Sequence, residues 1–288
     1  MKTLLRIRLA QLLDSFTGKK KKTRVSQAGY LVLFAVLFLV YGASFYMNFF
    51  SFGDACAADG TGTLYFAFAG LNAFAISFLL TAFSAGQSLF DGRDNDLLLS
   101  MPVKPVHIVV SRMLVSLLLG FVVDLTVLIP AELVRLRYGF SAVQLIFWVI
   151  MTILISLFSF ACSVLFGWLL SVLTRKSKKK DFIMSILSII AVIVCFIGIQ
   201  SVGRLSEYIL LDSDGAERMF RKYLYVFYAF GKACSEADAF SALLVAALSV
   251  VLSAAVAFAV VKTFFRLATE KASAGGKKYT GGGIGFRS

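Results

Sequence analysis

Acidic side chains gather in one short polar stretch of this sequence, where Asp91, Asp94 and Asp96 fall within six residues. An apolar run follows them: Leu97, Leu98, Leu99 and Met101. A carboxylate such as that of Asp94 can accept hydrogen bonds from the free backbone N–H groups that begin a helix. The leucine run then forms an apolar patch on a short helix at the membrane surface. Such a patch rests on lipid and on the protein's own helices, or it docks into a partner protein.

Two prolines bound this stretch, because proline suits the first turn of a helix and disrupts its interior. Pro102 and Pro105 therefore predict that one helix ends near Met101 and that another begins near Pro105.

Other reactive groups are sparse and scattered. The single histidine, His107, has no partner in sequence that would make it a general base or a metal ligand. The four cysteines show no metal-binding spacing. Cys56 and Cys234 are both expected outside the cell, where they pair or, as we favour, stay free. We therefore predict no catalytic residue, no metal site and no cofactor bound by this chain.

Asp124 is a separate case, because it lies inside an apolar segment that Pro130 is expected to end. An acid within a membrane is costly and is a functional candidate by default. Two interpretations stay open: structural pairing with Arg135 or Arg137, which we favour, and a role in a substrate or proton path. The expected end at Pro130 places Asp124 in the outer part of the bilayer.

Composition indicates which elements must position these groups. The sequence has 288 residues, of which 59% are hydrophobic and 16% charged, which is typical of membrane proteins. A spanning helix needs roughly 20 apolar residues. Five segments without Asp, Glu, Lys or Arg are long enough: 25–53, 60–90, 138–174, 182–203 and 239–261. A sixth, near 106–130, contains only Arg112 and Asp124. We expect an all-α membrane protein with six transmembrane helices.

The net charge of +13 is explained by the expected membrane topology. Lys and Arg concentrate in alternate connections and at both termini, which the positive-inside rule assigns to the cytoplasm. We therefore expect contact with the lipid bilayer and no nucleic-acid binding.

The predicted organisation has three parts. Residues 1–27 form a cytoplasmic leader with an amphipathic interfacial helix and a basic cluster. Residues 28–262 form the six-span domain, with a cytoplasmic loop at 84–112 and an outside segment at 204–238. Residues 263–288 form a flexible, Gly-rich cytoplasmic tail.

Aromatic residues make the outside segment unusual. The run 223–230 is too short to cross a membrane but too apolar for water, so it predicts re-entrant helices between spans 5 and 6. With Asp124, we select Tyr223 and Phe227 as candidate residues of a substrate path.

The acid–leucine–proline order at 89–103 is similar to the cytosolic loop between spans 2 and 3 in the permeases of type-2 ABC exporters. The resemblance extends to the interfacial leader, the six spans and the re-entrant helices. It implies a multi-pass permease of the bacterial plasma membrane, in which ATP and Mg²⁺ bind a separate ABC ATPase subunit and the chain is not itself an enzyme. The resemblance also implies which residues contact that ATPase: Asp91, Asp94, Asp96, Leu97, Leu98, Met101 and Pro102.

The resemblance also implies a second permease half, either a copy, a fused partner or another gene product. The alternative function is a membrane-embedded enzyme or a structural membrane protein that works without an ATPase.

Overall fold

The computed structural model describes residues 27–90, 105–174 and 204–275, together with four helical positions at 186, 189, 190 and 193. Within these residues every regular element is a helix, and five helices are long and apolar enough to cross a membrane. The elements are α2 (Gln27–Ala58), α3 (Gly62–Phe90), α5 (Pro105–Arg135), the 3₁₀ turn η1 (Leu136–Tyr138), α6 (Ala142–Thr174), α8 (Ser213–Tyr223), α9 (Tyr225–Glu236) and α10 (Ala239–Gly275). The chain is thus a multi-pass, all-helical membrane protein in the part that the structure describes.

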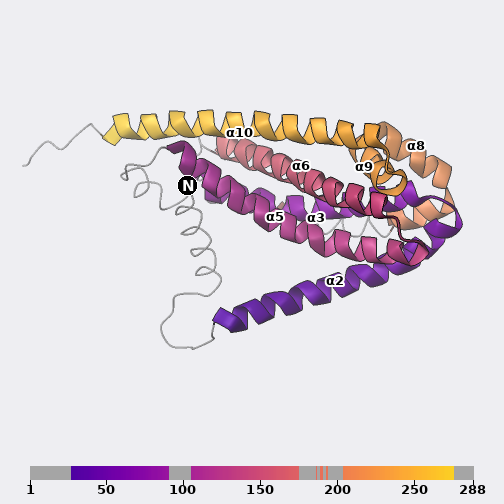
Figure 1. Ribbon diagram of the computed structural model, residues 1–288. Coiled ribbons are helices and arrows are strands. Elements are labelled where there is room, and N and C mark those ends of the chain that lie inside the picture. Colours follow the sequence, from indigo (N-terminus) through magenta and orange to yellow (C-terminus); the bar gives the residue numbers. More distant parts are fainter. Residues whose placement is uncertain are drawn as a thin grey trace, which may run out of the picture.

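Helix α3 is the centre of the bundle, with α5, α6 and α9 packed around it (Figure 1). Four small residues recur along it at every fourth position and are buried: Ala69, Ala73, Ser77 and Thr81. Small side chains let membrane helices approach closely. This row faces α6, where Thr81 Oγ1 lies 2.7 Å from Ser163 Oγ. Small side chains therefore join α3 closely to α6.

Helix α5 begins at Pro105, as predicted, but does not end at Pro130. It continues to Arg135 and into η1, and Gly139 (φ 147°) then turns the chain towards α6. Proline removes one hydrogen bond, yet neighbouring helices and local adjustments allow it inside membrane helices. Pro130 is buried in this packing, so the prediction of a helix end there was wrong.

Two short helices, α8 and α9, lie at the end of the bundle where α3, α6 and α10 begin (Figure 1). The Asp212 carboxylate caps α8 by accepting a hydrogen bond of 2.8 Å from the Gly215 N–H. The helical path breaks at Leu224, and α9 then packs between α3, α6 and α10. Asp238 caps α10, because its carboxylate accepts a 2.6 Å hydrogen bond from the Ser241 hydroxyl.

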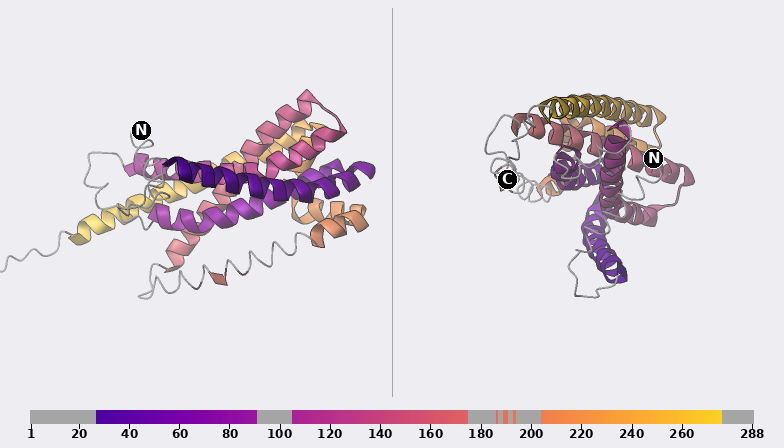
Figure 2. Two further views of the ribbon diagram at one scale, coloured as in Figure 1. Left: turned by 90° about the horizontal axis from the view of Figure 1, so that it is seen from below. Right: turned by 90° about the vertical axis from the view of Figure 1, so that its left-hand side faces the viewer.

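Helix α2 packs mainly on α5, and its first half diverges from the other helices (Figures 1 and 2). This half leaves large apolar side chains exposed: Val32, Val36, Leu37, Leu39, Val40 and Tyr41. Exposed apolar side chains are expected on a helix that contacts lipid.

Several predictions concern residues outside the described ones. They are the leader helix in 1–27, the tail after Gly275, and most of the predicted span at 182–202. The sixth span and the cytoplasmic position of both termini therefore stay predictions. The re-entrant course of 204–238, although these residues are described, also stays a prediction.

Candidate functional site

Asp124 lies in the middle of its membrane segment. The apolar part of α5 and η1 runs from Val109 to Tyr138, so Asp124 is about 21 to 22 Å from each end at 1.5 Å per residue. The predicted shallow position depended on a helix end at Pro130, which the structure does not show. The carboxylate is therefore far from both ends of this apolar segment.

The side chain of Asp124 is 1% exposed, and its polar neighbours come from two other helices. These neighbours are the hydroxyls of Ser77 on α3 and Ser156 on α6. Neither carboxylate oxygen has a partner at hydrogen-bond geometry. Asp124 therefore lies in a polar environment that leaves its carboxyl group unpaired.

The favoured pairing with Arg135 or Arg137 does not occur. Arg135 forms an ion pair with Glu132, with Nη2 at 2.5 Å from Oε1. The Arg137 guanidinium lies over the Phe50 ring, 4.2 Å from its centroid. Both cations have closer partners at the end of α5, because Asp124 lies about three to four helical turns deeper in the bundle.

The hydroxyls around Asp124 continue along the interface of α3, α5 and α6, and we call this group the hydroxyl seam. Its members are Ser77, Thr81, Asp124, Ser156, Ser159 and Ser163, all buried. The Thr81 hydroxyl lies 2.6 Å from the Ser77 carbonyl oxygen, and Ser163 donates a 2.8 Å hydrogen bond to the Ser159 carbonyl. The α3–α5 contact is close at Gly120, where an added Cβ would be 3.2 Å from Ser77 Oγ.

Phe227 of α9 covers this seam on the side of α8 and α9. Its ring centroid is 5.3 Å from that of Phe74 and 6.5 Å from that of Phe158. Phe74 lies one turn before Ser77 on α3, and Phe158 is adjacent to Ser159 on α6. Phe227, selected as a path residue, therefore packs on aromatic side chains that neighbour the seam on α3 and α6.

Tyr223, the other aromatic residue selected, is not brought to this place. It is 72% exposed, and the Lys222 ammonium lies 5.1 Å from its ring centroid. The break at Leu224 puts Tyr223 on α8 and Phe227 on α9.

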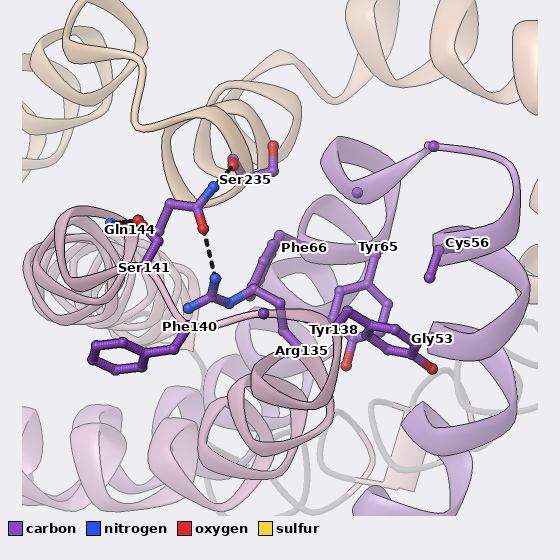
Figure 3. Close-up of a pocket in the computed structure, with 14 residues that line it drawn as sticks. Gly53, Cys56, Tyr65, Phe66, Arg135, Tyr138, Phe140, Ser141, Gln144 and Ser235 are labelled. Carbon is purple, nitrogen blue, oxygen red and sulfur yellow. Dashed lines mark hydrogen bonds between the residues drawn. The ribbon is translucent and has the colours of Figure 1, made fainter.

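A cavity of about 450 Å³ opens at the same end of the bundle as α9 (Figure 3). It lies between the α2–α3 connection, the α5–α6 connection and the last turn of α9. The residues that line it include Cys56, Tyr65, Arg135, Tyr138, Gln144 and Ser235.

Arg135 organises the polar wall of this cavity. Its guanidinium donates to Glu132 and, at 2.6 Å, to the side-chain oxygen of Gln144. The Gln144 amide in turn donates to the Ser235 carbonyl of α9 (Figure 3). The sequence analysis considered Arg135 only as a partner of Asp124 and missed the cavity. The sequence signal for this ion pair was the spacing of Glu132 and Arg135, because residues three positions apart on a helix are neighbours on its surface.

The cysteines near this end are unpaired. Cys56 and Cys234 are both buried and free, as the favoured interpretation predicted. Burial raises the pKa of the Cys234 thiol well above its ordinary value. Thiolate chemistry at Cys234 is therefore suppressed while α9 stays packed.

The residues selected for coupling to an ATPase lie outside the described residues. They are Asp91, Asp94, Asp96, Leu97, Leu98, Met101 and Pro102. Across the residues that the structure does describe, no three His, Cys, Asp or Glu side chains come together as a metal site would require.

Comparison with known proteins corrects the family assignment. Residues 28–282 match the model of a family described as membrane proteins of 12 TMs. That family is not the type-2 ABC permeases, so the resemblance drawn from the loop at 89–103 was wrong. The acid–leucine–proline order is short, and such an order also suits any amphipathic helix at a membrane surface. No curated protein and no solved structure matches the chain.

Proposed function

Because this chain belongs to the family described as membrane proteins of 12 TMs, we propose that it is the membrane-spanning part of a bacterial plasma-membrane transporter driven by a separate ATPase subunit. The observation that carries the proposal is Asp124, an unpaired acid buried in mid-membrane beside hydroxyl groups from two further helices. Ionisable residues at this depth mark substrate or ion paths, because burying them is otherwise costly.

The proposed topology has six spans with both termini in the cytoplasm. Helix α6 ends at Thr174, whereas α8 and α9 lie near its beginning, where Gln144 contacts Ser235. These two positions lie at opposite ends of α6, which supports the proposal that the predicted span at 182–202 is a sixth crossing. The predicted re-entrant course of 204–238 is supported by the burial of Phe227 and Phe230 against α3.

A second half completes the proposed transporter. The described residues contain five candidate membrane spans, and the proposed topology adds a sixth. In this proposal a unit with twelve spans therefore needs six further helices from a second half. The divergent, apolar first half of α2 offers a surface for either lipid or that second half.

The segment between α3 and α5 is the proposed ATPase contact. It connects Phe90 with Pro105 at the end of the bundle opposite α9, which the charge distribution assigns to the cytoplasm. In this proposal Leu97, Leu98 and Met101 fill a groove on the ATPase, and Asp94 and Asp96 guide its approach. Buried apolar anchors supply most of the binding energy of an interface, and rim charges mainly change the encounter rate.

The test is purification of the tagged full chain from its native membrane, followed by identification of co-purifying ATPases and measurement of ATP hydrolysis. Leu98→Asp should release the ATPase, because it buries an unpaired charge at a cost of several kcal/mol. Asp96→Lys, the matched control, should weaken binding less, with an effect that shrinks as salt is raised. Full ATPase association and activity in Leu98→Asp would refute the proposed contact.

A further inference from the structure

Among the described residues, no opposite charge lies next to Asp124. Helices α3 and α6, which supply its polar neighbours, have no Asp, Glu, Lys, Arg or His anywhere in their sequences. On α5 the first charged residue on either side of Asp124 is Glu132 or Arg112, about 12 and 18 Å away along the axis. Glu132 is already paired with Arg135.

Other titratable groups that face the bundle interior are also engaged or remote. The Tyr65 hydroxyl of α3 donates to the Ala131 carbonyl oxygen at 2.8 Å. Cys162 lies on α6, six residues beyond Ser156. On α9, Lys232 lies 3.5 Å from Asp238, and Glu236 accepts a hydrogen bond from Thr63 at the outer surface. On α10, Lys262 ends the membrane segment.

An ionised carboxylate cannot persist in such a place without a compensating cation. Transfer of an unpaired ion into a low-dielectric interior costs many kcal/mol, whereas a neutral acid behaves as an ordinary polar group. Ser156 matches the needs of the neutral acid, because its hydroxyl has no other partner and can both donate and accept. A metal cation needs several oxygen ligands together, and the hydroxyls of Thr81 and Ser163 are already hydrogen-bonded.

We propose that Asp124 is a reversible proton-binding site, which holds a proton while the hydroxyl seam is closed and releases it when Phe227 withdraws. The inference rests on the proposed transport function and adds the coupling ion to it. On release, the O–H bond of the Asp124 carboxyl breaks, the electron pair stays on the carboxylate, and the proton passes to a water molecule that enters the seam. Closure then requires a proton to return.

Position favours this cycle over a purely structural acid. Asp124 lies near the middle of the apolar segment Val109–Tyr138, so a proton released there can leave towards either side as access changes. Beside the seam, Phe227 of α9, a short helix of 12 residues, packs on Phe74. In this proposal, movement of α9 changes the hydration of Asp124.

The test is infrared difference spectroscopy on the full chain in lipid nanodiscs. A protonated carboxylic acid has a C=O stretching band distinct from that of a carboxylate, and this band shifts when the proton is exchanged for deuterium. We expect such a band at neutral pH in the wild type, where an exposed aspartate is fully ionised. Asp124→Asn should abolish it.

Glu132→Gln is the matched control, because Glu132 is equally buried on the same helix but ion-paired with Arg135. It should leave the band at full amplitude. The wild type titrated alone gives a second measurement that needs no variant: the band should persist through neutral pH and disappear on alkalinisation.

Three results would overturn the assignment. The first is the absence of a deuterium-sensitive carboxyl band at neutral pH, and the second is a band that survives in Asp124→Asn. The third is loss of the wild-type band when sodium chloride replaces choline chloride, because that result identifies a sodium site. Because this spectrum is recorded without nucleotide or ATPase, its failure is distinguishable from failure of the ATPase contact.

Discussion

Gly231 is the point at which α9 touches α3 backbone to backbone. A Cβ placed at this position would lie 2.1 Å from the Thr63 carbonyl oxygen and 2.8 Å from the Ala67 backbone nitrogen. Both contacts are with backbone, which cannot move aside as the end of a flexible side chain can. We therefore predict that Gly231→Ala forces α9 away from α3.

The expected cost follows from known effects of overpacking. Adding one methyl group to a packed core typically costs about 1 to 3 kcal/mol, and the two contacts with the α3 backbone place this site towards the upper end of that range. Each 1.4 kcal/mol changes an equilibrium tenfold. Undocking of α9 should therefore increase roughly 5- to 150-fold, while the membrane helices stay inserted.

Cys234, one turn after Gly231, supplies the assay. Its side chain is 1% exposed and its thiol pKa is raised by burial, so it reacts only when α9 undocks. In a full chain with Cys56, Cys162 and Cys195 changed to alanine, the labelling rate of Cys234 by a maleimide reports undocking directly. Gly231→Ala should raise this rate by the same factor.

Gly42→Ala is the matched control, because nothing lies within 4 Å of a Cβ at that position. It should leave the labelling rate unchanged, since Ala is also the better helix former. Equal labelling of Cys234 in wild type and Gly231→Ala would refute the close docking of α9.

Two further predictions concern the packed interior. Thr81→Val and Ser163→Ala should each lower the free energy of unfolding of the full chain in detergent. The double variant should lose about 0.6 kcal/mol less than the sum of the two single losses, because the two hydroxyls hydrogen-bond to each other. Exactly additive losses would contradict that bond. The docking of α9 should weaken as pH rises above about 9.0, the ordinary pKa of a cysteine thiol, because the raised pKa of Cys234 makes the folded state prefer the neutral thiol. Limited proteolysis of the α8–α9 region, followed across this pH range, should show the change in the wild type and less of it in Cys234→Ala.

Local sequence patterns were sufficient to predict the membrane helices and one of their packing surfaces. Pro105 marks a helix start because a proline at the first turn lacks only an N–H group that would be unpaired there. The four-residue recurrence of Ala69, Ala73, Ser77 and Thr81 identifies a face that permits close approach. Both features depend on neighbours within one helix, which a sequence displays directly.

Prediction of the candidate site required contacts between distant segments, which a sequence does not show directly. The end of α5 was misplaced because the rule against internal proline ignores the support that neighbouring helices give in a membrane. That error put Asp124 near Arg135, and the true partner of Arg135, Glu132, was overlooked although it is nearer in sequence. The cavity was missed because its walls come from connections far apart in the chain.

Helix α9 connects the two polar features of the bundle. Ser235, near its end, accepts a hydrogen bond from Gln144 at the cavity, and Phe227, near its start, covers the hydroxyl seam. The two residues lie eight positions apart, about 12 Å along one helix, and Gly231, midway between them, packs against α3. Because a short helix moves as a rigid unit, a change at the cavity that pulls on Ser235 must also shift Phe227. The proton on Asp124 and the contents of the cavity are thus expected to respond to the same movement.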